Sequence, residues 1–240
     1  MLFSEVLTQK LAAYHLLKHP FYQAWSAGTL QRETMAYYAQ QYAGHVQAFP
    51  RYLSAIHSQC EDLATRQILL ENLIDEEQGP ENHPALWAQF EKAMGETKSD
   101  RLYPQTEALH DTMSRLTQRK GFAKGMGALF AYEHQTPAIA ETKLKGLIEH
   151  YGIKDKAGLQ FFEVHAKADV WHTAVLADRL NALPPKQQRQ AERGAVTLAK
   201  ALWNFLDGIV EHAPGAKEAV DAAMQAAVDK ADAVDTAAAA

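Results

Sequence analysis

Apolar residues recur three and four positions apart along almost the whole chain, which is the spacing of one face of an α-helix. Segments of alternating polar and apolar residues joined by hairpin turns are absent from the sequence. We therefore predict an all-α protein. The clearest helical face is formed by Ala195, Leu198, Leu202, Phe205, Leu206 and Ile209.

Signals for helix ends support this prediction. Gly121 and Gly152 each follow a helical run and are expected to take the left-handed conformation of a C-terminal cap. Thr136-Pro137 has the order of an N-cap followed by proline in the first turn. Leu183-Pro184-Pro185 separates two long helices. The predicted helices span 3–18, 28–59 with a bend at Pro50, 62–77, 83–95, 102–119, 121–135, 137–151, 155–181, 185–212 and 215–230.

These helices are expected to form one domain over residues 1–230, because no long linker divides them. Residues 231–240 are rich in Ala and are expected to fray. No apolar run reaches the roughly 18–20 residues of a membrane helix, and residues 1–5 do not begin a secretory signal. The net charge of −5 argues against a basic face for nucleic acid. We expect a cytoplasmic protein that binds neither membranes nor nucleic acid.

One predicted helix carries three potential metal ligands on one face. His165, Asp169 and His172 follow one another at intervals of four and three residues, which places them within about 60° of arc. Asp169 and His172 have the spacing of the carboxylate–x–x–histidine element in di-iron helix bundles. The flanking apolar residues indicate a buried helix, and a buried carboxylate must be paired or bound to metal. A structural network of ion pairs explains this face about equally well.

Two other segments offer the same chemistry. Glu76 lies near the acidic end of one predicted helix, and His83 begins the next helix after a short loop. Glu133 lies on an otherwise apolar helix. Taken singly, Glu76 could be solvated and Glu133 could be a paired core carboxylate. Taken together, three carboxylates and three imidazoles could hold two divalent ions, with iron or manganese favoured and zinc also compatible: Glu76, His83, Glu133, His165, Asp169 and His172.

The order and spacing of these six residues resemble the pattern found in one branch of a known family. The pattern is a Glu, a His seven residues later, a second Glu within a helix, and a His-x3-Asp-x2-His helix. This is the pattern of the di-metal oxidase branch of the haem-oxygenase-like superfamily, which also contains the TenA thiaminases and PqqC. Within that branch the sequence resembles CADD, the chlamydial protein associating with death domains, and its bacterial relatives, the p-aminobenzoate synthases. The resemblance runs from about His19 to about Leu206.

The resemblance implies a fold, cofactors and a reaction. It implies a haem-oxygenase-like, TenA-like multi-helix bundle that forms a homodimer. It implies two non-haem metal ions, iron alone or with manganese, and dioxygen and an external reductant as co-substrates. The implied product is p-aminobenzoate for folate synthesis.

The family is described as self-sacrificing, because a tyrosine of the protein supplies the aromatic ring and a lysine supplies the amino group. By resemblance these residues are Tyr22 and Lys143. Tyr132 and Tyr38 match further aromatic positions that could relay electrons or order the site. Phe161 stands where some relatives are expected to carry a tyrosine, so a radical relay at that position is in doubt here.

The residue types agree with this chemistry. A tyrosine already holds a para-substituted ring, and a lysine buried near cations would have a lowered pKa and act as a neutral nucleophile. Two metals about 3.5–4 Å apart can bind dioxygen in a water-poor cavity. Because most tyrosines in a helical protein serve the core and most lysines are solvated, the roles of Tyr22 and Lys143 rest on the resemblance.

The sequence is also compatible with other functions. The same metal site could oxidise a free small molecule, with Tyr22 and Lys143 lining its pocket. A non-enzymatic interaction protein is an alternative of another class, although no feature of the sequence indicates contact with death domains.

Other members of the superfamily fit the sequence less well. A thiaminase needs a cysteine in its pocket, and the single cysteine, Cys60, follows the end of a helix. A haem oxygenase could use His15 or His19 but would leave the three carboxylates unexplained. Three glycines within residues 121–127 favour close helix packing over phosphate binding, because no strand precedes them.

Overall fold

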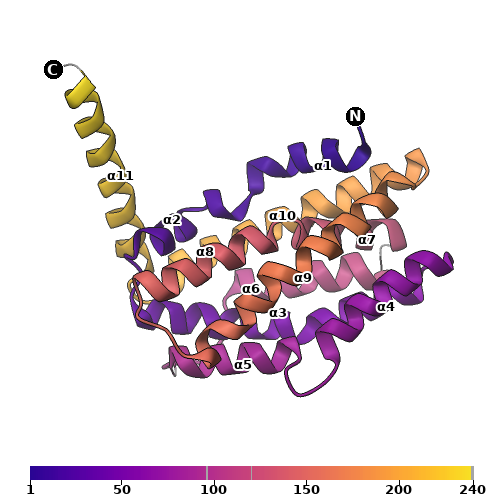
Figure 1. Cartoon of the computed structure of the whole chain (residues 1–240), viewed down its shortest axis with the longest axis horizontal. Helices are drawn as coiled ribbons and strands as arrows, with labels where there is room; N and C mark the ends of the chain where they lie inside the picture. Colours follow the sequence, from indigo (N-terminus) through magenta and orange to yellow (C-terminus); the bar gives the residue numbers. More distant parts are fainter. Residues whose placement is uncertain (96, 120, 239–240) are drawn as a thin grey trace.

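The structure is a computed structural model of the 240-residue chain. It describes residues 1–95, 97–119 and 121–238, without the side chains of residues 167–170, 232 and 234–238. Every regular element in this part of the chain is helical, which confirms the predicted all-α class. Figure 1 shows the helices, whose bounds are α1 Phe3–Leu11, α2 Pro20–Ala27, α3 Arg32–Ser58, α4 Leu63–Glu77, α5 His83–Met94, α6 Pro104–Ser114, α7 Phe122–Glu133, α8 Thr136–Glu149, α9 Lys156–Asn181, α10 Pro185–His212 and α11 Ala216–Ala238.

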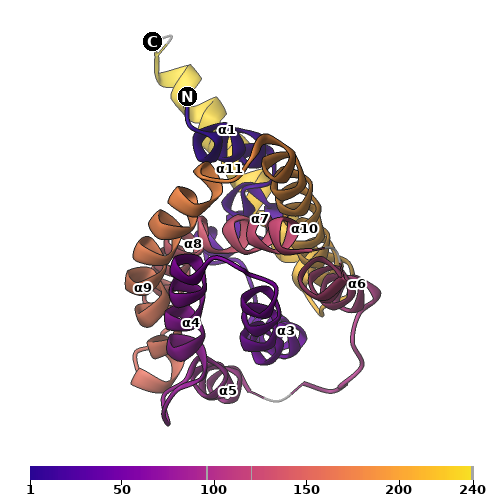
Figure 2. The ribbon, with the colours of Figure 1, turned by 90° about the vertical axis from the view of Figure 1, so that its right-hand side faces the viewer.

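Helix α3 lies at the centre of the bundle, with other helices around it (Figure 2). It packs against α4, α5, α6 and α7, while α10 lies along α7 and α6, and α9 packs against α8 and α5. This position explains why α3 buries side chains on several faces, including polar ones. Gln41 is fully buried, and it is satisfied because its amide donates to the Arg101 carbonyl and accepts from the Tyr103 amide and the Thr106 hydroxyl.

Glycines allow α7 and α10 to cross at close range. A Cβ atom on Gly127 would lie 1.9 Å from the carbonyl oxygen of Ala191, and one on Gly194 would lie 2.1 Å from that of Lys124. The glycine-rich segment therefore serves helix packing, as predicted. The crossing fixes α7, the helix that ends at Glu133, against the core.

The N-terminal region differs from the prediction of one helix over residues 3–18. Helix α1 ends at Leu11, and two short 3₁₀ turns lead to the separate helix α2. The ring nitrogens of His15 and His19 accept hydrogen bonds from the backbone amides of Leu17 and Phe21, 3.3 and 3.1 Å away. These side-chain caps stabilise extended backbone at both histidines, which interrupts the helix.

Other boundaries agree more closely. Gly152 has a positive φ angle of 68°, as expected for a cap. Gly121 also has a positive φ, but with φ 90° and ψ 157° it is not in the predicted left-handed cap conformation and instead begins α7 as its N-cap. Helix α3 continues as one helix through Pro50. Residues 115–119 form a π-helical turn after α6 rather than α-helix. Helix α11 extends to Ala238 and projects from the body (Figure 1), so its backbone is helical over much of the segment that was expected to fray.

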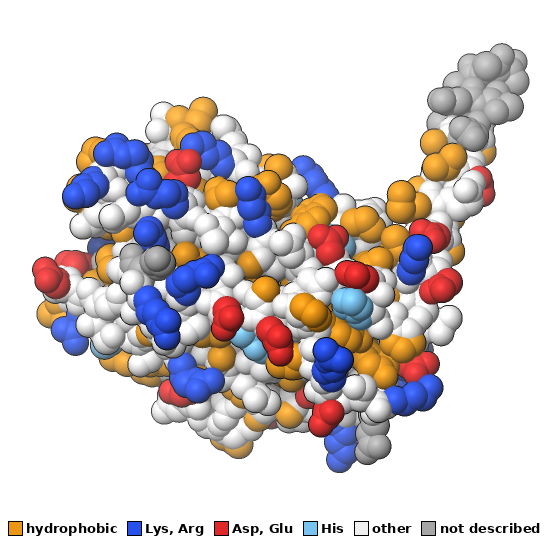
Figure 3. All heavy atoms as spheres, turned by 180° about the vertical axis from the view of Figure 1, so that it is seen from behind, with side chains coloured by type: hydrophobic (Ala, Val, Ile, Leu, Met, Phe, Trp, Pro, Cys, Tyr) orange, Lys and Arg blue, Asp and Glu red, His pale blue; other side chains and the backbone are white. Residues whose placement is uncertain are grey.

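The surface carries charges of both signs. Figure 3 shows Lys and Arg side chains together with Asp and Glu side chains over one face of the molecule. Among the described residues, none of the helices has the length and apolar character of a membrane span.

Candidate metal centre

Glu76 and His83 face each other across the turn between α4 and α5. Glu76 lies in the last turn of α4, and His83 is the first residue of α5, which Asn82 caps by accepting from the Ala85 amide. The Glu76 Oε2 and His83 Nδ1 atoms are 2.8 Å apart, and both side chains are buried. The loop therefore brings together two ligand types that lie seven residues apart in the sequence.

His165 approaches this pair from α9. Its Nδ1 donates to the Phe161 carbonyl at 2.7 Å, which fixes the orientation of the ring. The centroids of the His165 and His83 rings are 4.2 Å apart. One ligand atom from each of Glu76, His83 and His165 lies within 4.8 Å of the others, so these three buried side chains can share one metal ion.

Glu133 reaches the same region from α7. It is buried, and its Oε1 accepts a hydrogen bond of 2.7 Å from the Asn72 amide on α4. Asn72 precedes Glu76 by four residues and so lies on the same face of α4. Asn72 was not predicted as a site residue, although its spacing from the candidate ligand Glu76 indicates a shared helix face.

His172 also contacts α4. Its Nε2 lies 3.1 Å from the Oδ2 atom of Asp75, a half-exposed residue that was not predicted to belong to the site. His172 itself is buried. The Asp169 side chain, predicted as the sixth ligand, lies outside the described residues.

The predicted ligands that the structure describes lie on or near the last turns of α4, but among the described residues only Glu76, His83 and His165 have ligand atoms grouped within 4.8 Å. Glu76 groups with His83 and His165, while Glu133 and His172 contact Asn72 and Asp75 on the same stretch of helix. The donor set combines carboxylates and imidazoles in a buried setting, which suits non-haem iron or manganese. The residues present therefore fit a metal centre.

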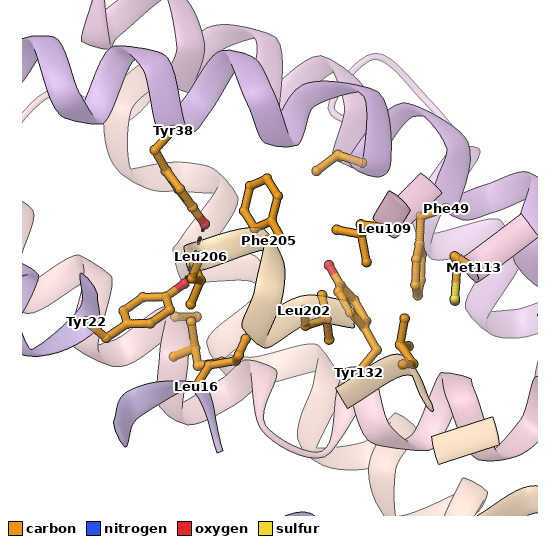
Figure 4. Packing of buried hydrophobic residues seen from close by; sticks show 14 of the residues in the cluster. Leu16, Tyr22, Tyr38, Phe49, Leu109, Met113, Tyr132, Leu202, Phe205 and Leu206 are labelled. Carbon is orange, nitrogen blue, oxygen red and sulfur yellow. Dashed lines mark hydrogen bonds between the residues drawn. The ribbon is translucent and has the colours of Figure 1, made fainter. Parts of the chain in front are cut away.

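A small cavity adjoins this centre. His165 and Phe161 form part of its wall, and its volume is about 40 Å³. Figure 4 shows Tyr22 and Tyr38 pointing toward each other from different helices, with their hydroxyl oxygens 3.4 Å apart. Burial raises the pKa of both phenols above the ordinary value, so both are protonated at neutral pH. The cavity is also lined by Leu16, Tyr42, Tyr132, Gln135, Thr136, Ile139, Ala140, Lys143, Phe162, Leu202, Phe205 and Leu206.

Lys143 extends from α8 into this aromatic environment. It is 5% exposed, and its Nζ atom lies 4.8 Å from the centroid of the Tyr38 ring and 5.6 Å from that of Tyr22. The amine donates a hydrogen bond of 2.5 Å to the Tyr38 hydroxyl. Burial lowers the pKa of Lys143 to about 7, so a neutral amine is readily accessible near neutral pH.

Tyr132 and Tyr42 form a second hydroxyl pair in the same cavity. The Tyr42 hydroxyl donates to the Tyr132 hydroxyl at 3.0 Å, and Tyr42 stacks on Tyr38 at a centroid distance of 5.9 Å. The structure thus places Tyr132 and Tyr38 on the cavity with Tyr22. Tyr42 was not singled out from the sequence, although it follows Tyr38 by one helical turn.

The residues of the less favoured alternatives lie elsewhere. Cys60 is buried after the end of α3 and is not among the residues that line this cavity. Both ring nitrogens of His19 are engaged, one by the Phe21 amide and the other by Asp207 at 3.1 Å. His19 therefore serves as a helix cap in this structure.

Comparisons with known proteins identify relatives of this chain. Residues 36–204 match a family described as iron-containing redox enzymes. The 4-aminobenzoate synthase of Nitrosomonas europaea is 41% identical over 226 residues, which cover 88% of this chain and 92% of that protein.

Two solved structures share the fold. One is a CADD-like protein of unknown function from Nostoc punctiforme, with a TM-score of 0.71 and 21% identity over 88% of this chain and 95% of that one. The other is a TenA homolog from Pseudomonas syringae, with a TM-score of 0.74 and 17% identity over 87% of this chain and 93% of that one. The chain therefore belongs to the iron-containing redox enzymes with the haem-oxygenase-like fold, in the group that includes the Nitrosomonas 4-aminobenzoate synthase.

Proposed function

We propose that this protein is a dioxygen-dependent p-aminobenzoate synthase that consumes two of its own side chains. Tyr22 supplies the aromatic ring and Lys143 supplies the amino nitrogen. The observation that carries the proposal is that the buried Lys143, the buried Tyr22 and the candidate ligand His165 line one small cavity. The sequence similarity to a 4-aminobenzoate synthase over most of the chain supports the same reaction.

The metal ligands in this proposal are the six residues predicted from the sequence. Two ions held there, iron alone or iron with manganese, would supply the oxidising power for breaking the tyrosine side chain with dioxygen and an external reductant. Phe161 contributes to the site through its carbonyl, which orients the His165 ring. Asn72 holds one oxygen of Glu133 through its amide. The ligand set is Glu76, His83, Glu133, His165, Asp169 and His172.

Lys143 acts as the nitrogen donor because its amine is neutral for a substantial fraction of molecules near pH 7. A neutral amine has a lone pair that can attack an electrophilic ring carbon, whereas an ammonium group cannot. The hydrogen bond to Tyr38 holds the amine inside the cavity. Tyr38 thus positions Lys143, while its own hydroxyl faces that of Tyr22.

The cavity volume favours this reaction over oxidation of a free aromatic substrate. A cavity of about 150 Å³ accepts benzene, whereas the volume beside Tyr22 is about 40 Å³. This space suits a few water molecules or dioxygen. A ring that is part of the wall does not have to enter the cavity.

Ring-labelled tyrosine tests the proposal. Protein that contains ¹³C-ring tyrosine is loaded with iron and manganese and exposed to oxygen and a reductant, and the released p-aminobenzoate is analysed by mass spectrometry. We expect a fully labelled ring from wild type and no product from Tyr22→Phe. Tyr37→Phe is the matched control, because Tyr37 is buried on α3 but is not among the cavity-lining residues. An unlabelled product would support the free-substrate oxidase instead.

The proposal extends to assembly and location. We propose a homodimer that acts in the cytoplasm, as the sequence resemblance implies. Light scattering of the purified protein measures the first property, and fractionation of cells that express the native chain measures the second.

A further inference from the structure

His45 lies in the middle of α3 and is fully buried, yet neither of its ring nitrogens has a hydrogen-bond partner among the described residues. A buried polar atom left without a hydrogen bond destabilises the folded protein. Gln41, one turn earlier on the same helix, is equally buried but fully bonded. The unused nitrogens of His45 therefore require an explanation other than packing.

The inner side of the His45 ring faces the tyrosine pair of the cavity. The ring centroid is 5.0 Å from that of Tyr42 and 5.3 Å from that of Tyr132. The Tyr42 hydroxyl, which donates to Tyr132, lines the cavity next to the metal centre. Tyr52 and Phe49 complete the surroundings on α3, each with a centroid distance of 6.0 Å.

A second imidazole, His110 on α6, lies beside the residue that precedes His45 and is close enough to affect its charge. A Cβ atom on Gly44 would lie 2.7 Å from Cε1 of His110, so the glycine next to His45 makes room for this second imidazole. His110 is half-buried, and its Nε2 atom is likewise buried without a hydrogen-bond partner in the described part of the chain. Glu107 and Asp111 flank it on α6 and are exposed.

Both imidazoles are suited to carry protons as neutral rings. Burial lowers the pKa of His45 to about 3, and a charged His110 lowers it further. Burial also lowers the pKa of His110, while Asp111 and Glu107 raise it. A neutral imidazole can accept a proton on one nitrogen and release the proton held on the other, which leaves it uncharged in the other tautomer.

We propose that His110 and His45 form a proton route from the surface at α6 to the hydroxyl of Tyr42. His110 takes a proton from water on one ring nitrogen and passes the proton of its other nitrogen to His45. His45 then passes the proton of its other nitrogen to the Tyr42 oxygen, while Tyr42 gives its own hydroxyl proton to the Tyr132 oxygen along their hydrogen bond and Tyr132 releases its hydroxyl proton into the cavity. Each passage moves one proton and no electrons. No hydrogen bond to the described residues fixes the His45 ring in one orientation. This inference rests on the proposed function, in which reduction of dioxygen beside the cavity consumes protons.

Hydroxyl exchange in the metal-free protein tests the route directly. Tyrosine labelled with ¹³C at the ring carbon that bears the hydroxyl reports, by NMR in mixed H₂O and D₂O, how fast each phenolic proton exchanges with solvent. We expect His45→Phe to slow exchange at Tyr42 by at least about tenfold, since an acid–base relay is lost. The hydroxyl of Tyr38, which bonds to Lys143, serves as the internal control.

His110→Phe tests the route from its outer end and is expected to give the same slowing. A loosened structure would accelerate exchange at both tyrosines, so a slower rate at Tyr42 alone cannot come from loss of stability. His45→Phe is also expected to resist urea at least as well as wild type, because two unsatisfied buried atoms are removed. If His45→Phe does not fold, His110→Phe carries the test.

Unchanged exchange at Tyr42 in the variants that fold would overturn the proton route. This outcome is distinct from failure of the proposed function. If wild-type protein releases no p-aminobenzoate but its exchange at Tyr42 slows in His45→Phe, the proposed function is wrong and the proton route stands.

Discussion

The Lys143 amine donates a hydrogen bond of 2.5 Å to the hydroxyl of Tyr38. The same hydroxyl lies 3.4 Å from that of Tyr22, so one phenol links the candidate nitrogen donor to the candidate ring donor. All three side chains are buried and come from different helices, α8, α3 and α2. This contact explains how the fold keeps a lysine in an aromatic cavity.

Lys143 should make stability depend on pH in a defined direction. Its pKa is about 7 in the folded protein against an ordinary value of 10.5. Between these values the unfolded chain binds a proton that the folded protein lacks, so the free energy of unfolding rises with pH, by about 1.4 kcal/mol per unit at most. The contribution of Lys143 to the free energy of unfolding is fully present above the ordinary pKa of 10.5, and it is lost as the pH falls to about 7.

We therefore expect Lys143→Met to be more stable than wild type near pH 7, and its advantage to shrink by about 2 kcal/mol between about pH 7 and pH 9. Urea unfolding at the two pH values measures the difference. Lys145→Met, at an exposed position on the same helix, should retain the wild-type pH dependence. A stability difference for Lys143→Met that does not vary with pH would show that the amine is not buried in its neutral form.

Asn72→Ala should weaken metal binding without removing a ligand. The variant loses the 2.7 Å hydrogen bond that orients Glu133, and loss of such a supporting bond typically costs about 10–100-fold in affinity. Titration of metal-free protein with Fe²⁺ under anaerobic conditions measures the effect. Asn204→Ala, at an exposed position on α10, is the control. Equal affinities in the two variants would show that the hydrogen bond from Asn72 to Glu133 does not support metal binding.

Metal binding should also stabilise the fold. For wild type, Fe²⁺ at about a hundred times its dissociation constant is expected to add about 2.7 kcal/mol to the free energy of unfolding. Glu76→Gln should lose most of this gain, because Glu76 groups with two imidazoles within 4.8 Å. Glu77→Gln, at the exposed neighbouring position, should keep it. Equal stabilisation of both variants would exclude Glu76 as a ligand.

Gly127→Ala should destabilise the protein through the contact between α7 and α10. The added methyl group would lie 1.9 Å from the Ala191 carbonyl oxygen, which belongs to backbone and cannot move alone. We expect a loss of about 3 kcal/mol in urea unfolding. Gly125→Ala meets the side chain of Ile56 at 2.8 Å and should cost less, because a side chain adjusts more easily. A larger loss of stability in Gly125→Ala than in Gly127→Ala would contradict this account of the two glycines.

The sequence predicted the helices best where spacing and end signals agreed. The long helices α9 and α10 begin and end within one or two residues of the predicted bounds. The break after Leu11 was missed because apolar residues continue through the 3₁₀ turns, and the caps at His15 and His19 use a side chain that is not a typical N-cap.

The site was harder to predict because it depends on distances between segments. The grouping of Glu76 with His83 and His165 follows from how α4, α5 and α9 pack, which residue spacing does not encode. Asn72 and Asp75 look like ordinary polar residues of a solvated helix until the fold places Glu133 and His172 against them. The roles of Tyr22 and Lys143 came from the family resemblance alone.

The mass of the intact protein tests the central claim most directly. Protein loaded with iron and manganese is measured before and after exposure to oxygen and a reductant, and its peptides are then mapped. We expect p-aminobenzoate to be released together with a mass loss in the peptide that contains Tyr22 and a change at Lys143. Release of p-aminobenzoate from a protein whose mass stays unchanged would contradict the claim.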